Sequence, residues 1–359
     1  MIREVRYKGI FETLRKEILS GKYLSSARFP SDNSLAKRFK VGRQTVYQAV
    51  SKLQDCGLVR RERGSGTYLT RSARGRAGAI AVVAPSFPKT EIVPVICREL
   101  SRICQENDRL LWFLDEYSTS PGEALENLRK TAEKLVEQKV AGVIFRPVDY
   151  YENSEEINRT VTSVLKRSGI PLVLIDSEMV TPPDDSGFDI VGVDNMMTGW
   201  LLGRHVVEKG AKRILYVYRA RSSSNVNLRL IGIKAAVSVK NPKVRVEEAC
   251  MSDLSATTWT RVVRKFRPDA ILCSGDVVAG QVVKILSRMR LRIPKDVMVA
   301  GVDDVEISRV ITPALTTIRQ PCEEIARVAF ELLGWRMSNP DAMVRRIALP
   351  ARLIVRDSA

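Results

Sequence analysis

Apolar residues in the first 55 positions recur with the spacing of amphipathic helices. In and just beyond the stretch VGRQTVYQAV, residues 41–50, they fall at i, i+3, i+4 and i+7, which predicts a helix packed on a core. This apolar side consists of Val46, Ala49, Val50 and Leu53. Similar patterns predict one helix over about residues 10–18 and another that begins after Ser31, a natural N-cap. A short turn, Lys40-Val41-Gly42, separates the last two helices, which is the outline of a helix-turn-helix.

The pattern changes to a period of two after Gly57. The segments LVRRER (58–63) and TYL (67–69) flank Gly64-Ser65-Gly66, which predicts a β-hairpin with a glycine turn. Three helices followed by a basic hairpin form a winged helix-turn-helix. In that fold the third helix can enter the major groove of DNA.

Beyond residue 78, short apolar runs alternate with amphipathic segments of helical length. A first set comprises AIAVVA (79–84), LLWFL (110–114), GVIF (142–145) and PLVLI (171–175). A second set comprises IVGV (190–193), RILYV (213–217), KVRVEEA (243–249), AILC (270–273) and VMVAG (297–301). Continuous apolar strands between helices predict parallel sheets covered on both faces, so we expect an α/β domain of two lobes with two parallel sheets. Ligands of such sheets bind at the carboxyl ends of the strands, here in a cleft between the lobes.

Charge is concentrated at the N-terminal end. Residues 1–76 contain 18 Lys and Arg against 6 Asp and Glu, whereas the other 283 residues contain 40 against 35. A basic head on a nearly balanced body indicates a module that binds a polyanion. Between the two parts, the basic and glycine-containing stretch 71–78 (RSARGRAG) is typical of an interdomain linker.

The polar face of the third predicted helix contains no acidic residue. Arg43 can reach O6 and N7 of guanine, and Gln44 can pair with N6 and N7 of adenine. Tyr47 either contacts DNA or packs its ring against the turn. The arginines of the wing, Arg60, Arg61 and Arg63, lie beside the glycine tip, where the backbone can approach phosphate or the minor groove.

The head resembles the GntR family of DNA-binding domains over about residues 5–70. The residues that carry the resemblance are Tyr7, Phe29-Pro30-Ser31-Asp32, Leu35-Ala36, Phe39-Lys40-Val41, Arg43, Thr45-Val46, Leu53, Gly57-Leu58-Val59 and Gly64-Ser65-Gly66-Thr67-Tyr68. The resemblance implies that the start of the third helix and the tip of the wing contact operator DNA. The candidate DNA-binding residues are Asp32, Arg43, Gln44, Thr45, Tyr47, Arg61, Arg63, Gly64, Ser65 and Gly66. This chain has Gly42 where the family usually has Ser or Thr, and Tyr47 where it usually has a second arginine.

Polar residues follow several predicted strands of the body at the positions that face such a cleft. These residues are Ser86 and Phe87, Asp176 and Ser177, Ser274-Gly275-Asp276, and Asp303-Asp304. Carboxylates that accept hydroxyl groups, together with an aromatic ring, suit a sugar-like ligand. Asp276 and Asp304 alternatively cap the helices that follow them.

The body resembles the effector domain of LacI/GalR repressors, which is similar to periplasmic sugar-binding proteins, from about 79 to 356. The resemblance rests on FDIVGVDNMMTGWLLGRHVVEKGAKRI, NLRLIGIKAAV, RPDAILCSGD, RIPKDVMVAGVDD and PALTTIRQP. By position it implies effector contacts at Asp176, Arg229, Asp303 and Gln320, near the loop with Ser86 and Phe87. Gly275-Asp276 stands where the family usually has Asn-Asp, which removes the amide that would hydrogen-bond a ligand; Asp276 is also a candidate. His205 matches a family position on a helix, where we expect a packed core histidine.

A GntR-type head on a LacI-type body is the architecture of arabinose-repressor-like regulators. We therefore expect a winged helix-turn-helix at 1–70, a linker at 71–78, and a two-lobed ligand-binding and dimerisation domain at 79–359. The expected function is transcriptional regulation, as a repressor that a sugar-like effector releases from double-stranded operator DNA. A homodimer would place two heads on two half-sites.

Two other classes of function compete with this one. An enzyme fused to a DNA-binding head has little support, because the body shows no Walker A loop, no GxSxG and no nucleophile–base pair. An architectural DNA binder without a ligand would not need polar residues at the mouths of both lobes. We therefore expect no catalytic residues and no cofactor.

The remaining composition agrees with a cytoplasmic regulator. The six cysteines form no CxxC pair and mostly lie among apolar residues, as expected of free thiols in a reducing compartment. With His205 as the single histidine, a histidine-rich metal site is excluded. No segment of the sequence approaches the length of a membrane-spanning helix, and the N-terminus lacks an apolar signal-peptide core.

Overall fold

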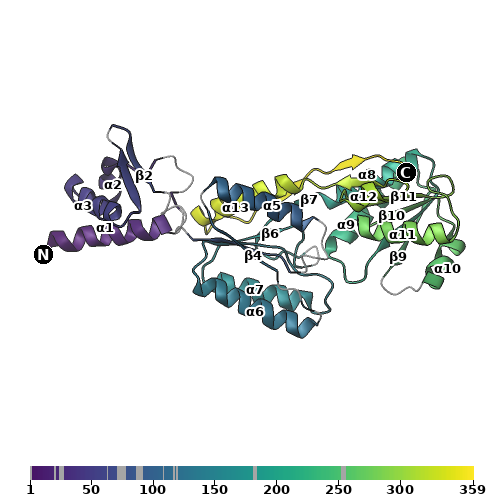
Figure 1. The fold of residues 1–359 in the computed structure, drawn as a ribbon, viewed down its shortest axis with the longest axis horizontal. Coiled ribbons are helices and arrows are strands. Elements are labelled where there is room, and N and C mark those ends of the chain that lie inside the picture. The colour runs from purple at the N-terminus through teal and green to yellow at the C-terminus, as the bar shows by residue number, and fades with distance from the viewer. Residues whose placement is uncertain are drawn as a thin grey trace.

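The computed structural model describes residues 2–19, 22–23, 28–62, 64–70, 78–85, 92–107, 109–115, 118, 120, 121–180, 184–251 and 256–359. They form an N-terminal head and two α/β lobes, and the chain begins in the head and ends in the second lobe (Figure 1). Among the described residues, no helix has the length and apolar character needed to cross a membrane.

The head is a three-helix unit with a wing. Its helices are α1 (Ile2–Leu19), α2 (Asp32–Phe39) and α3 (Arg43–Asp55). The strands β1 (Val59–Glu62) and β2 (Gly66–Leu69) pair antiparallel to form the wing. The Ser31 hydroxyl accepts a hydrogen bond from the Ser34 amide at 3.2 Å, so Ser31 is the N-cap that the sequence predicts.

The predicted apolar stripe of α3 forms the centre of this head. Its four side chains are fully buried, and they pack with residues from α1, α2 and the wing. Leu14, Ile18 and Leu35 are among these partners. Burial of this one stripe therefore leaves the opposite face of α3 free for other contacts.

The first lobe is a six-stranded sheet in the order β13-β7-β6-β5-β3-β4, with parallel pairing throughout. The strands are β3 (Ile80–Val83), β4 (Leu111–Leu114), β5 (Gly142–Phe145), β6 (Leu172–Ile175), β7 (Asp189–Val193) and β13 (Arg346–Leu349). The helices α5 (Val93–Glu106) and α13 (Cys322–Ser338) cover one face, and α6 (Pro121–Glu137) and α7 (Ser154–Arg167) cover the other (Figure 1).

The second lobe repeats this arrangement in the order β14-β12-β11-β10-β8-β9. Its strands are β8 (Arg213–Tyr218), β9 (Arg245–Cys250), β10 (Ala270–Cys273), β11 (Met298–Asp303), β12 (Thr316–Arg319) and β14 (Arg352–Ile354). Among the described strands of this second sheet, only the β12–β14 pair is antiparallel. The helices α8 (Asn195–Glu208) and α9 (Ser224–Lys240) pack on one face, and α10 (Ala256–Phe266) and α11 (Asp276–Arg288) on the other; the short α12 (Ile307–Val310) follows β11.

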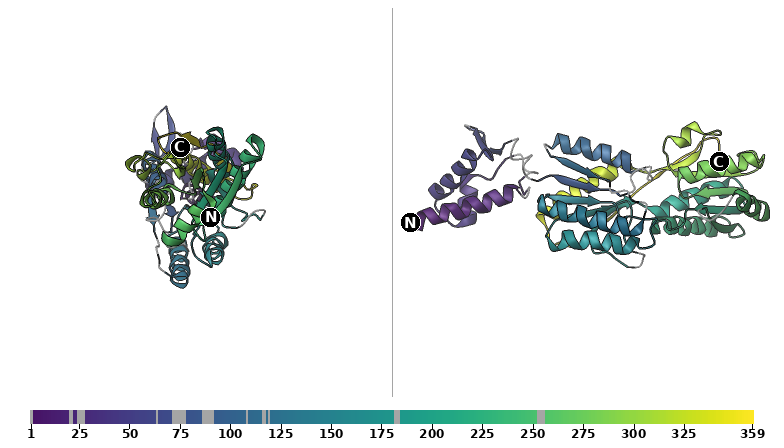
Figure 2. Two further views of the ribbon diagram at one scale, coloured as in Figure 1. Left: turned by 90° about the vertical axis from the view of Figure 1, so that its right-hand side faces the viewer. Right: turned by 60° about the horizontal axis from the view of Figure 1, so that its bottom comes forward.

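The sheets differ from the sequence prediction in two respects: β12, β13 and β14 were not predicted, and one predicted strand belongs to the other sheet. The run IVGV, predicted in the second set, lies in β7, which pairs with β6 and β13 of the first sheet. The chain then crosses between the lobes after β7, after β12 and after β13. These three segments connect the two lobes, which lie side by side in Figure 2.

Candidate functional site

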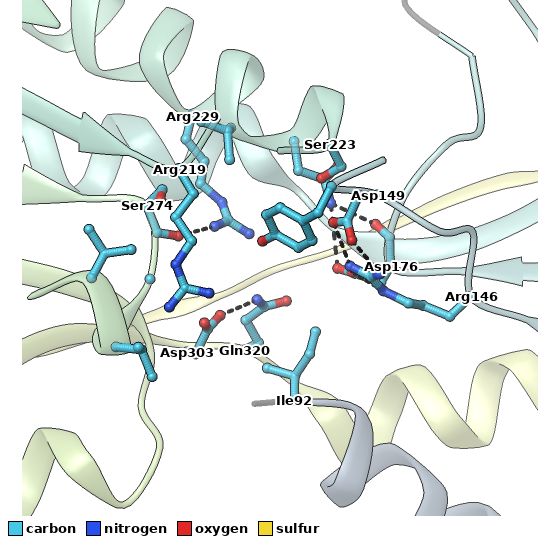
Figure 3. A pocket seen from close by; sticks show the side chains of 16 residues that line it. Ile92, Arg146, Asp149, Asp176, Arg219, Ser223, Arg229, Ser274, Asp303 and Gln320 are labelled. Carbon is cyan, nitrogen blue, oxygen red and sulfur yellow. Dashed lines mark hydrogen bonds and ion pairs between the residues drawn. The ribbon is translucent and has the colours of Figure 1, made fainter. Parts of the chain in front are cut away.

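A cavity between the two lobes is lined by residues at the carboxyl ends of strands from both sheets (Figure 3). The first lobe contributes Arg146 after β5 and Asp176 after β6. The second lobe contributes Arg219 after β8, Ser274 after β10, Asp303 at the end of β11 and Gln320 after β12. The cavity has a volume of about 90 Å³. The parallel topology of each sheet is what brings these distant segments together.

On the side of the first lobe, Arg146 holds two carboxylates. Its Nη1 and Nη2 donate to the two oxygens of Asp149 at 2.9 Å each, and its Nε donates to Oδ2 of Asp176 at 3.3 Å. All three side chains are buried. Burial alone would lower the pKa of Arg146, but the charges of Asp149 and Asp176 raise it above its usual value, so the guanidinium stays charged. Across the gap, the Asn225 amide of α9 donates to the backbone oxygen of Asp176 at 3.0 Å.

On the side of the second lobe, Arg229 connects three segments. Its Nε donates to Oδ1 of Asn195 on α8 at 2.8 Å, and its Nη1 donates to the Ser274 carbonyl after β10 at 2.6 Å. The side chain is 6% exposed. Both bonds fix the plane of the guanidinium at the cavity wall.

Asp303 and Gln320 form a hydrogen-bonded pair beside Arg229. Nε2 of Gln320 donates to Oδ1 of Asp303 at 2.6 Å. Burial raises the pKa of Asp303 to about 6, against the opposing influence of Arg229 and the Gln320 hydrogen bond. Oε1 of Gln320 is buried and accepts no hydrogen bond from any residue that the structure describes. A ligand hydroxyl in the cavity would satisfy this acceptor.

The predicted effector residues therefore divide into three groups. Asp176, Arg229, Asp303 and Gln320 come together at the cavity. Ser86 and Phe87 lie outside the described residues. Asp276 is fully buried and does not line the cavity, which corrects the prediction for this residue.

The carboxylate of Asp276 has protein partners instead. Thr317 Oγ1 donates to it at 2.6 Å, and the Val305 amide donates to it at 3.1 Å. These bonds attach α11 to β12 and to the segment after β11, and the N-cap of α11 is Gly275. Asp304 is likewise not a cap, because it pairs with Arg309, Arg319 and Arg356. His205 lies partly buried on α8 and is not a cavity residue.

Arg146, Asp149 and Arg219 also line the cavity and were not predicted from the sequence. Arg146 and Arg219 come directly after buried strands, in GVIFRP and RILYVYR. The rule that selected Asp176, a polar residue directly after an apolar strand, would have selected both arginines. The residues predicted from the sequence were instead carboxylates, serines and an aromatic ring that suit a sugar, and no arginine directly after a strand was among them.

The exposed face of α3 carries three of the four residues of this helix that were predicted to bind DNA. Arg43 and Gln44 are exposed in its first turn, and Tyr47 is 47% exposed. Thr45 is only 8% exposed, so most of its surface faces the core of the head. The backbone of Gly64 and Gly66 has positive φ at the tip of the wing, which favours glycine. Arg63 lies outside the described residues.

Arg61 and Asp32 interact with each other at the edge of this face. Nη2 of Arg61 lies 3.3 Å from Oδ2 of Asp32, and both side chains are partly buried. The guanidinium also stacks over the Tyr47 ring. Tyr47 therefore contacts the wing rather than leaving its ring free.

Two parts of the chain match known families. Residues 6–69 match the gntR family of bacterial regulatory proteins, and residues 204–359 match the periplasmic binding protein-like domain.

Individual relatives and a solved structure extend these matches. The arabinose metabolism transcriptional repressor of Geobacillus stearothermophilus is 24% identical over 341 residues, which are 91% of this chain and 90% of that protein. The ribose operon repressor of Escherichia coli (strain K12) is 26% identical over 239 residues, 65% of this chain and 69% of that protein. A LacI family transcriptional regulator from Enterococcus faecium, solved with bound ribose, has a TM-score of 0.63 at 21% identity and covers 78% of this chain and 98% of that chain. The similarity to the arabinose repressor thus includes both the head and the lobes.

Proposed function

We propose that this chain is a transcriptional repressor controlled by a sugar-like ligand. It joins a GntR-type DNA-binding domain to a periplasmic-binding-protein-like domain and is homologous to arabinose metabolism repressors and LacI-family regulators. We assign residues 1–70 to DNA binding, 71–78 to a linker, and 79–359 to ligand binding and dimerisation. DNA binding puts its site of action in the cytoplasm, on double-stranded operator DNA, with no enzymatic step.

The observation that carries the ligand part of the proposal is the Asp303–Gln320 pair. A buried amide oxygen without a partner among the described residues is costly unless something else donates to it. The Asp303 carboxylate beside it is a second acceptor, and Arg229 supplies donors on the same wall. Neighbouring hydroxyl groups, which both donate and accept, match this mixture of acceptors and donors.

The DNA-binding part rests on the exposed start of α3. Arg43 and Gln44 project from its first turn, where a recognition helix reaches base edges. The balance of charge in residues 1–76 adds attraction to phosphate that does not depend on sequence. Two heads of a homodimer would read two half-sites.

The ligand acts on the head through the orientation of the lobes. Contacts already join the lobes near the cavity: the Tyr150 amide donates to the Arg221 carbonyl at 2.8 Å, and Asn225 donates to Asp176. A ligand held by residues of both lobes favours one relative orientation over the other. Such a difference in affinity between two states typically couples sites by about 1–3 kcal/mol.

The test uses the purified full-length chain and an operator selected from a library of random duplexes. A panel of pentoses, hexoses and sugar acids is then screened for release of the operator, measured by fluorescence anisotropy, and for a rise in melting temperature. A ligand at 100 times its Kd stabilises the chain by about 2.7 kcal/mol. We expect Arg229→Gln to bind the operator normally and to lose release by the ligand. Failure to select any preferred duplex would contradict the DNA-binding part, and failure of every sugar would contradict the ligand part.

A further inference from the structure

Three arginines line the cavity, and they differ in how their guanidinium groups are used. Arg146 is bound to Asp149 and Asp176, and Arg229 is bound to Asn195 and the Ser274 carbonyl. Arg219 makes no side-chain hydrogen bond or ion pair with any residue that the structure describes. It is half-buried, and in Figure 3 its side chain extends from the end of β8 into the cavity, in the direction of Asp303.

The acidic residues of the cavity are largely occupied by other partners. Arg146 takes both oxygens of Asp149 and one oxygen of Asp176, and Gln320 donates to Asp303. A half-buried guanidinium without a partner is unfavourable, because it loses water without gaining a counter-charge. Arg219 therefore provides donors that the described protein residues leave unused.

We propose that Arg219 binds an anionic group, a carboxylate or a phosphate monoester, on a ligand of monosaccharide size. A guanidinium matches both groups because it donates two parallel hydrogen bonds to two oxygens. The Asp303–Gln320 pair and Arg229 then hold the hydroxyl groups of the same ligand. This inference rests on the proposed function and narrows its ligand from any sugar to an acidic or phosphorylated one.

The size of the cavity supports a single sugar unit. The cavity has a volume of about 90 Å³, several times the roughly 10–15 Å³ that one water needs. This small size favours one sugar unit over an oligosaccharide.

The experiment compares ligands that differ only in the anionic group. The probes are D-glucose, D-glucuronate and D-glucose 6-phosphate, D-galactose and D-galacturonate, and D-ribose and D-ribose 5-phosphate, at constant ionic strength. Binding to the full-length chain is measured by calorimetry and by melting temperature. We expect an acid or a phosphate to bind more tightly than its neutral parent, and the comparison between the two arms tells which group Arg219 holds.

Variants connect that preference to Arg219. We expect Arg219→Gln to lower the affinity for the anionic ligand by about 30-fold or more, as when one partner of a buried charge pair is removed. The affinity for the neutral parent sugar, which is weaker, should stay unchanged. Arg219→Lys keeps the charge without the two parallel bonds and should retain part of the affinity. Arg221→Gln is the matched control, because the Arg221 side chain pairs with Glu152 outside this cavity.

Two results would overturn the inference while leaving sugar control intact. One is a neutral sugar that binds more tightly than its own acid or phosphate and releases the operator. The other is an Arg219→Gln variant whose affinity falls by the same factor for neutral and for anionic ligands. If no probe of either series binds, the proposed function itself fails.

Discussion

The guanidinium carbon of Arg61 lies 4.2 Å from the centre of the Tyr47 ring. Arg61 belongs to the wing and Tyr47 to α3, and the same guanidinium pairs with Asp32 at the start of α2. One side chain thus connects the wing to both helices of the helix-turn-helix. A cation over an aromatic face is attracted to it, and the ion pair with Asp32 limits where that cation can go. Arg61 is therefore placed to orient the Tyr47 ring on the exposed face of α3.

The first prediction is that Arg61→Ala weakens binding to the selected operator more than it weakens binding to a random duplex. Without the guanidinium, the Tyr47 ring is free to rotate, and base contacts that depend on its position are lost. A double-mutant cycle with Tyr47→Ala should show a coupling of about 0.5–1 kcal/mol in operator binding. The measurement is a titration of both DNAs at constant salt.

Arg60→Ala is the control for this prediction. Its side chain is exposed, pairs with Glu62 and stacks on Tyr68, away from Tyr47. We expect Arg60→Ala to weaken binding to the operator and to the random duplex by the same factor. If Arg61→Ala also weakens both alike and shows no coupling to Tyr47, then Arg61 contacts only phosphate.

The second prediction concerns Arg43, the first residue of α3. Its exposed guanidinium is the group on this helix best suited to guanine, so Arg43→Ala should cost about 1–3 kcal/mol of operator binding and relax the base preference at one position. Arg15→Ala removes another exposed arginine, from α1, and should leave the base preference unchanged. A repeated selection from the random library with each variant makes the comparison. An unaltered preference for Arg43→Ala would remove it from base recognition.

Local sequence patterns were sufficient to predict features that depend only on residues nearby in the sequence. The helical spacing of Val46, Ala49, Val50 and Leu53 marks the buried side of α3, and all four are buried. By contrast, the place of β7 beside β13 depends on a segment about 150 residues later in the chain. Periodicity identifies a strand but does not identify its neighbours.

The residues of the candidate site also divide into those that could be placed from the sequence and those that could not. Parallel strands bring their carboxyl ends to one edge, so Asp176 and Asp303 could be placed near each other from the sequence. Whether such a residue faces the cavity depends on partners that the sequence does not reveal. Asp276 follows the same rule, but Thr317 and Val305 bind its carboxylate inside the second lobe. That the guanidinium of Arg219 has no side-chain hydrogen bond or ion pair with the described residues likewise becomes apparent only when the partners of the other two arginines are known.

The third prediction is a pH dependence from Asp303. Burial raises its pKa in the folded chain to about 6, above the ordinary value of 3.8. Protonation then favours the folded state, so this contribution to stability is complete below about pH 4 and is lost as pH rises through about 6. Relative to Asp303→Asn, which does not titrate, the wild-type melting temperature should fall between pH 4.5 and 7.

Asp296→Asn provides the control, since a hydrogen bond from Arg292 lowers the pKa of Asp296 to about 2, outside this range. The difference in melting temperature between Asp296→Asn and the wild type should stay constant between pH 4.5 and 7. A constant difference for Asp303→Asn as well would mean that Asp303 is ionised throughout, held in that form by a nearby cation.

The last prediction concerns the glycines that allow α8 and α9 to touch. A Cβ on Gly199 of α8 would lie 1.8 Å from the Arg229 carbonyl, and one on Gly232 of α9 would lie 1.9 Å from the Met196 carbonyl. Backbone cannot yield as a side chain can, so Gly199→Ala must push α9 away from α8. Because Arg229 is on α9 at this contact, its guanidinium would leave Asn195 and the Ser274 carbonyl.

For Gly199→Ala we expect a loss of at least about 1–3 kcal/mol in the free energy of unfolding, together with loss of the ligand response in the protein that remains folded. Gly334→Ala on α13 is the matched control: nothing lies within 4 Å of its Cβ, and it should be neutral or stabilise the helix by about 0.5–1 kcal/mol. Urea unfolding of the two variants decides the question, and equal midpoints for Gly199→Ala and the wild type would show that the helices have room for a methyl group and that their contact does not position Arg229.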